Sequence, residues 1–193
     1  MSDGEMFDPM AIVAVFNQYG VDYVVIGGFA AELHQATVMP TRDIDFTPST
    51  TQENLDRLSA ALTDLGARIR TAGVPEGLPF SHDGVSLARA AMWNLTSDLG
   101  EFDLSFRPSG TDGYDDLVRH ALRLRVRGQE MPVASLSDVI RSKEAAGRQK
   151  DLSALPDLVR RLEAQRGTSL DDLEVSMTRR AEQRRGGPPP PPL

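Results

Sequence analysis

The sequence contains no cysteine. This absence excludes disulfide bonds, zinc sites built on thiolates and cysteine nucleophiles. No apolar run approaches the roughly 20 residues that a membrane-spanning helix requires. Residues 1–9 are acidic and lack the basic-then-apolar order of a secretory signal. We therefore expect a cytoplasmic protein that has no membrane partner.

The acidic and basic residues are unevenly distributed along the chain, although the net charge is only -7. Residues 1–118 hold 6 Lys and Arg against 18 Asp and Glu, whereas residues 119–193 hold 15 against 10. Clustered carboxylates suit divalent cations, and a basic region suits nucleic acid or a triphosphate. Solvated helix faces are the alternative explanation for the basic region.

Hydrophobic periodicity and turn residues predict an α+β domain with a helical C-terminal part. Strands are expected at residues 22–26, 43–47, 67–71, 93–97, 101–106, 122–127 and 130–134. Helices are expected at residues 10–19, 29–35, 51–65, 138–150, 154–165 and 169–184, and residues 72–83 are expected to form a mobile loop. The predicted organisation is a core over residues 1–135, a helical part packed on it over residues 136–185, and a disordered Pro-rich tail over residues 186–193.

The segment Asp43-Ile44-Asp45-Phe46 alternates polar and apolar residues, as a half-buried strand does. Alternation places Asp43 and Asp45 on one face, where two carboxylates roughly 6 Å apart repel by about 3 kcal/mol at an effective dielectric near 20. A divalent cation relieves this repulsion, and Mg²⁺ favours one or two carboxylates together with substrate phosphates. The alternative is a strand edge that exposes two acids to water.

Two further features support a phosphate-binding site. Gly27-Gly28 ends a predicted strand and opens a helix, where backbone N–H groups and the helix dipole attract phosphate; a tight turn alone would need only one glycine. In Glu101-Phe-Asp-Leu-Ser-Phe106, alternation directs Asp103 away from the core. If that strand lies beside residues 43–47, Asp103 supplies a third carboxylate, as two-metal phosphoryl transfer requires.

A basic cluster follows in the segment from Lys143 to Asp151. On one continuous helix, Lys143, Gly147 and Lys150 would share a face, because they follow i, i+4, i+7 spacing. A lysine there would neutralise triphosphate charge. The alternative is a solvated basic helix.

Together these residues resemble the polymerase-β-like nucleotidyltransferase superfamily. Within it, the chain is most similar to the small bacterial nucleotidyltransferase toxins of abortive-infection and toxin–antitoxin systems, including the AbiEii and MenT-like groups. The resemblance covers residues 10–165. The fold it implies is a mixed sheet with flanking helices, followed by a helical C-terminal part. The residues that carry it are Ile26-Gly27-Gly28, Thr41-Arg42-Asp43-Ile44-Asp45-Phe46, Asp103-Leu104 and Lys143 through Asp151.

The resemblance implies a role for each of these residues. Asp43, Asp45 and Asp103 would bind metal and, with Lys143, form the catalytic set. The nucleotide-binding residues would be Gly27, Gly28, Thr41, Arg42, Lys143, Arg148, Lys150 and Asp151. The chain departs from the superfamily at Gly28, where serine often stands, as the toxin-like branch also does.

The function that the resemblance implies is transfer of a nucleotide from a nucleoside triphosphate to the 3′ end of tRNA, with release of pyrophosphate. The enzyme would use Mg²⁺ or Mn²⁺, block aminoacylation and translation as a toxin, and bind a cognate antitoxin. One alternative is a nucleotidyltransferase that modifies a protein hydroxyl or a small molecule such as an aminoglycoside. A non-catalytic nucleotide-binding antitoxin is the other.

Overall fold

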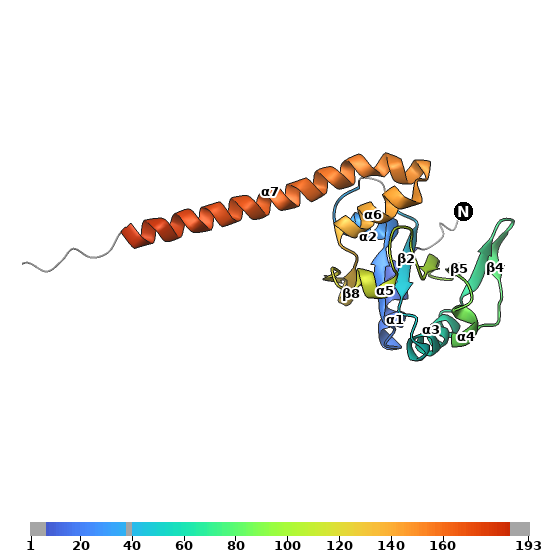
Figure 1. Ribbon diagram of the computed structural model, residues 1–193. Coiled ribbons are helices and arrows are strands. Elements are labelled where there is room, and N and C mark those ends of the chain that lie inside the picture. The colour runs from blue at the N-terminus through green and yellow to red at the C-terminus, as the bar shows by residue number, and fades with distance from the viewer. Residues whose placement is uncertain (1–6, 38–39, 186–193) are drawn as a thin grey trace, which may run out of the picture.

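The protein folds around one mixed sheet of eight strands, which the computed structural model shows in the order β4-β3-β5-β6-β2-β1-β8-β7 (Figure 1). The model describes the backbone of residues 7–37 and 40–185, and the side chains of residues 7–37 and 40–167. The strands are β1 (Tyr23–Ile26), β2 (Asp43–Pro48), β3 (Arg68–Thr71), β4 (Val74–Leu78), β5 (Met92–Ser97), β6 (Gly100–Ser105), β7 (Leu122–Val126) and β8 (Gln129–Val133). The helices are α1 (Pro9–Gln18), α2 (Gly27–Leu33), α3 (Gln52–Asp64), α4 (Gly84–Leu87), α5 (Tyr114–Leu117), α6 (Leu136–Ala146) and α7 (Gln149–Arg185).

The hydrophobic core lies on the α1 side of the central strands. Phe16 of α1 packs against Phe46 of β2 and Phe102 of β6, with ring centroids 4.6 and 6.3 Å away. Ile44 and Leu104 are fully buried on the same side. The predicted alternation of both strands is therefore confirmed, and their acidic residues lie on the opposite face of the sheet.

The predicted secondary structure is wrong in three places. Residues 72–83 do not form only a loop, because Ala72 and Gly73 make a two-residue turn that joins β3 to β4 in an antiparallel hairpin. The helix predicted over residues 138–150 ends at Ala146, because Gly147 adopts a left-handed conformation with φ 62°. The helices predicted over residues 154–165 and 169–184 are one helix, α7, since a single glycine at position 167 costs only about 1 kcal/mol among strong helix formers.

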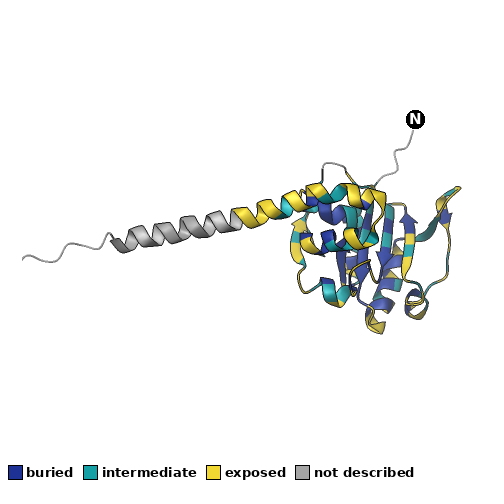
Figure 2. Ribbon diagram, turned by 45° about the horizontal axis from the view of Figure 1, so that its top comes forward, coloured by how far each residue is buried: buried dark blue, intermediate teal, exposed yellow. Residues whose placement is uncertain are grey.

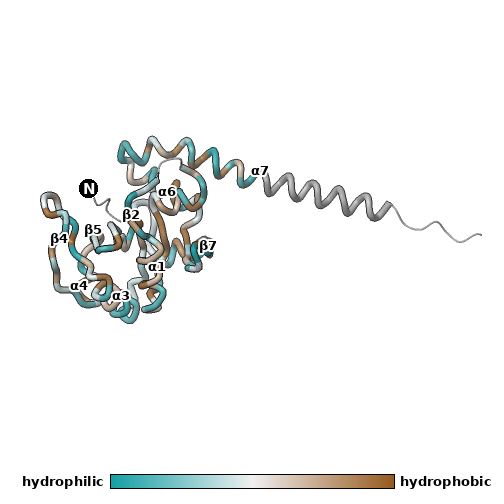
Figure 3. The backbone as a smooth tube through the Cα atoms, turned by 180° about the vertical axis from the view of Figure 1, so that it is seen from behind, coloured by the Kyte–Doolittle hydropathy of each residue, from teal (hydrophilic) through white to brown (hydrophobic). Residues whose placement is uncertain are grey.

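The first turns of α7 pack on α6, and the helix then extends away from the sheet (Figures 1 and 2). Apolar residues gather in the sheet and α1, whereas the part of α7 whose side chains are described is largely hydrophilic (Figure 3). Within the described residues, none of the helices combines the length and the apolar character needed to cross a bilayer. The predicted tail, residues 186–193, lies outside the described residues.

Candidate active site

The predicted site residues meet where four strands run side by side. Ile26 of β1 pairs with Asp45 of β2, Asp45 with Asp103 of β6, and Asp103 with Asn94 of β5. Residues directly opposite one another in neighbouring strands share a face of the sheet. Asp45, Asp103 and Asn94 therefore form a row across the sheet, which we call the carboxylate row. Asp43, two residues before Asp45, lies on the same face.

The Gly27-Gly28 turn begins where this row reaches β1. Gly27 has φ 73°, a conformation that strongly favours glycine, and a Cβ atom there would overlap the carboxylate of Asp45. A Cβ atom at Gly28 would lie 3.1 Å from Oγ1 of Thr41. That hydroxyl donates a hydrogen bond of 2.7 Å to Oδ1 of Asp43. The first turn of α2 thus lies directly against the side chains of Asp45 and Thr41, and Thr41 links it to Asp43.

Negative charge accumulates at Asp45. Burial, followed by the neighbouring charges of Asp43 and Asp103, raises the pKa of Asp45 to about 7. Lys143 and Lys150 oppose this increase in the pKa, so both ammonium groups lie near the cluster. The mutual repulsion of these carboxylates is unfavourable, and a bound cation would remove it.

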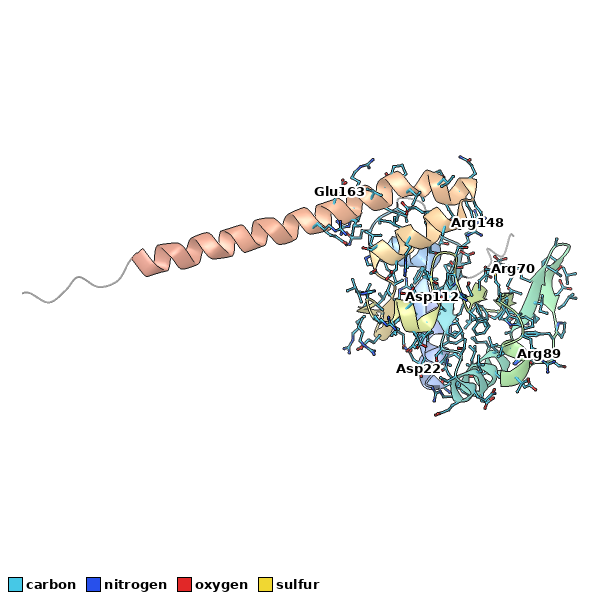
Figure 4. All side chains as sticks on the ribbon, viewed as in Figure 1. Asp22, Arg70, Arg89, Asp112, Arg148 and Glu163 are labelled. Carbon is cyan, nitrogen blue, oxygen red and sulfur yellow. The ribbon has the colours of Figure 1, made fainter. Side chains whose placement is uncertain are left out.

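Asp103 has a partner that sequence reasoning missed. Nη2 of Arg70, from β3, donates to Oδ1 of Asp103 at 2.6 Å, and Nη1 of Arg70 pairs with Glu101. Burial raises the pKa of Asp103, and Arg70 only partly offsets this effect. Figure 4 shows Arg70 between the central sheet and the β3–β4 hairpin. Alternation within β3 does place Arg68 and Arg70 on one face, but the sequence does not reveal that this face adjoins Asp103.

The basic cluster is built differently from the prediction. Because α6 ends before Gly147, Lys143 and Lys150 belong to different helices and do not share a helix face. Instead, Nζ of Lys143 and Nε of Arg148 bind the two carboxylate oxygens of Asp151, at 2.9 and 2.6 Å. The Asp151 side chain is only 3% exposed. Burial alone would raise the pKa of Asp151, but these two partners hold it below its usual value.

Arg42, Lys150 and Thr41 are the remaining predicted nucleotide-binding residues. Arg42 and Lys150 are exposed, whereas the Thr41 backbone N–H donates to Oε2 of Glu32 at 3.2 Å. A cavity of about 270 Å³ lies between residues 35–37 and α7 and contains none of the predicted site residues.

Asp45 of the carboxylate row and its neighbour Asp43 suit a divalent cation. Asp43 and Asp45 offer hard oxygen ligands beside the Gly27-Gly28 turn, and Mg²⁺ prefers one or two carboxylates plus substrate phosphates. Among the side chains that the structure describes, no three acidic or histidine residues already converge on one point. Asp103 is engaged by Arg70, so its role as a metal ligand stays a prediction.

A Gly-Gly turn beside paired strand carboxylates, with lysines near them, is typical of a nucleotidyltransferase, and the family match shows that the protein is an enzyme of this class. The comparisons narrow the class further. The chain belongs to the aminoglycoside-2''-adenylyltransferase family, whose model matches residues 9–155. No curated protein matches the chain significantly.

Two solved structures support the same fold. The lincosamide antibiotic adenylyltransferase LnuA, bound to lincomycin, is 14% identical, with a TM-score of 0.52 over 82% of this chain and 96% of its own. The antibiotic-resistance factor ANT(2'')-Ia is 16% identical, with a TM-score of 0.50 over 91% of this chain and 94% of its own. The predicted nucleotidyltransferase fold is confirmed.

The predicted biological role is wrong. The family match points to antibiotic-modifying adenylyltransferases and not to toxins that act on tRNA. The alternative of a small-molecule acceptor agrees with the family instead. A physical reason for the error lies in the basic region over residues 119–193, which includes Arg123 and Arg125 of β7. Both pair with Glu130, and β7 is the edge strand of the sheet, with β1 and β8 between it and Asp45.

Proposed function

We propose that the protein transfers AMP from ATP to a hydroxyl group of an aminoglycoside-type antibiotic and releases pyrophosphate. The observation that carries this proposal is the family match, which spans Gly27, the carboxylates of β2 and β6, and Lys143. The acidic character of residues 1–118 is compatible with an acceptor that bears ammonium groups.

In the proposed reaction, the acceptor hydroxyl oxygen forms a bond to the α-phosphorus of ATP. The bond from that phosphorus to the bridging oxygen breaks, and pyrophosphate leaves with the electron pair. Asp103, next to Asp45 in the carboxylate row, is our candidate to accept the hydroxyl proton, since its raised pKa makes it a better base than an exposed aspartate.

The other residues bind and orient the nucleotide. The backbone N–H groups at Gly27 and Gly28 would hold phosphate at the start of α2. Lys143 would act as a point charge on the triphosphate. Asp43 and Asp45 would hold Mg²⁺, which when bound neutralises phosphate charge during transfer.

Incubation of the protein with Mg²⁺, tobramycin and ATP labelled at the α-phosphate tests the proposal. We expect the label to appear on tobramycin, with a mass increase corresponding to one AMP, and we expect no product from Asp43→Asn. If the wild-type protein binds ATP but labels no aminoglycoside, the proposed acceptor class is wrong.

A further inference from the structure

The carboxylate row continues past Asp103 toward β3. Antiparallel pairing joins Ile69 of β3 to Leu95 of β5, so the next residue, Arg70, stands level with Asn94. Asn94 in turn pairs with Asp103. Gly27 and α2 adjoin the other end of the row, where the nucleotide is expected. An acceptor must therefore approach from the side of β6, β5 and β3, where Arg70 lies.

Arg70 reaches across an intervening strand to make its contacts. Strands in a sheet lie about 4.8 Å apart, so the backbones of β3 and β6 are separated by about 10 Å. The Arg70 side chain spans this gap over Asn94 and pairs with both Glu101 and Asp103. The Arg70 and Glu101 side chains remain 26% and 40% exposed. The Asp103 side chain is only 13% exposed, so these ion pairs are part-buried and are open to solvent mainly at Arg70 and Glu101. This open side faces the direction from which we expect the acceptor.

The chemistry of the pair suggests what it does. An ammonium group of an aminoglycoside would seek carboxylates near the reacting hydroxyl. Glu101 and Asp103 are the nearest acids on the acceptor side of Asp45, and a guanidinium of this chain already holds both. Each cation that enters must compete with Arg70 for them.

We propose that Arg70 sets the acceptor specificity by occupying, on Glu101 and Asp103, the position of an acceptor ammonium group. This inference rests on the proposed function and deepens it. Arg70 lowers the affinity for acceptors with several amino groups more than for acceptors with one, because a polycationic acceptor depends more on these carboxylates. Arg70 is a specificity residue and takes no part in bond making.

The test measures binding separately from transfer. Tobramycin, with several amino groups, and lincomycin, with one, are titrated by calorimetry at low salt without nucleotide. We expect Arg70→Gln to bind tobramycin about fivefold or more tightly than the wild type, and lincomycin with less than about twofold change. Arg70→Lys, which keeps the charge, should behave as the wild type. Arg68→Gln is the matched control, because Arg68 lies on the same strand but pairs with Asp98.

A second variant tests whether the gain in tobramycin affinity depends on Glu101. Arg70→Gln combined with Glu101→Gln restores the charge balance, and we expect it to lose most of the gain in tobramycin affinity. Unchanged or weaker tobramycin binding by folded Arg70→Gln would overturn the inference, as would an equal gain with Arg68→Gln or a double variant that keeps the full gain. If the wild-type protein transfers AMP but Arg70→Gln shows no gain, only this inference fails. If the wild type neither binds nor modifies tobramycin, the proposed function fails with it.

Discussion

Replacement of Asp45 by asparagine should stabilise the metal-free protein. Burial and two neighbouring acids raise the pKa of Asp45 from 3.8 to about 7. The folded state therefore binds the Asp45 proton more tightly than the unfolded chain does. Stability is lost as the pH rises from about 4 to about 7, and the full cost is present above that range. Asparagine has nearly the same shape and no charge, so it removes this cost.

The size of the effect follows from the same values. A rise of roughly three pH units corresponds to about 4 kcal/mol at about 1.36 kcal/mol per unit, which is an upper limit. Asp45 keeps some contact with solvent, and relaxation lowers the gain to about 1–2 kcal/mol. For a chain of this length, that gain raises the melting temperature by about 3–6 °C.

Thermal melting at pH 8.5 in a chelator is the assay. Asp64→Asn, at an exposed position near the end of α3, is the control for loss of one negative charge and should change the melting temperature little. The advantage of Asp45→Asn should disappear near pH 4. Addition of Mg²⁺ and ATP should stabilise the wild type more than the variant. If Asp45→Asn melts at or below the wild-type temperature at pH 8.5 without metal, the accumulation of charge at Asp45 has been misjudged.

Three other substitutions test the site. Asp43→Ala should reduce AMP transfer by at least about a hundredfold while the circular dichroism spectrum stays unchanged; transfer at the wild-type rate would remove Asp43 from the site. Gly27→Ala should destabilise the fold by about 2 kcal/mol or more, because the left-handed conformation and the Asp45 carboxylate both oppose a Cβ atom. Gly66→Ala is the control, because Gly66 has φ 58° and open space around it and therefore measures the backbone cost alone. If Gly27→Ala and Gly66→Ala lose the same free energy of unfolding in denaturant melts, the predicted overlap with Asp45 is refuted. Lys143→Ala should weaken ATP binding about tenfold. It should also lower the melting temperature, because Asp151 would keep only Arg148 as a partner, whereas Lys143→Arg should retain part of the ATP affinity and part of the stability. Unchanged ATP affinity in Lys143→Ala would leave the lysine a structural role only.

Local sequence patterns were enough to place the carboxylates of β2 and β6 on one face of the sheet. The alternation around Asp43 and in the segment from Glu101 to Phe106 predicted which side chains leave the core. The additional condition, that those two strands lie side by side, holds in the structure because β2 and β6 are parallel neighbours. The fold class followed from the same patterns.

The features that escaped prediction depend on long-range packing. Arg70 reaches Asp103 only because β3 is joined to β6 through β5, and no local pattern encodes that order of strands. The end of α6 depends on the left-handed conformation of Gly147. Residue spacing alone does not show whether a glycine lies inside a helix or ends it. The acceptor could not be read from the catalytic residues, because Gly27 and the carboxylates of β2 serve nucleotide transfer whatever molecule receives the nucleotide.

In the proposed reaction, these two tasks fall on different sides of the carboxylate row. On the nucleotide side, α2 is held to α7 by Nε of Arg161, which donates to the carbonyl oxygen of His34 at 2.9 Å. The His34 ring contacts the carbonyl oxygen of Ala134 at the start of α6, also at 2.9 Å. These contacts link α2, α6 and α7 to one another at the C-terminal end of α2. On the proposed acceptor side, the exposed Asn94 and the partly exposed Arg70 and Glu101 lie together on the sheet. Substitutions there can change the acceptor without disturbing the nucleotide site, so the residues that distinguish this protein from its relatives should be sought around Arg70, Asn94 and Glu101.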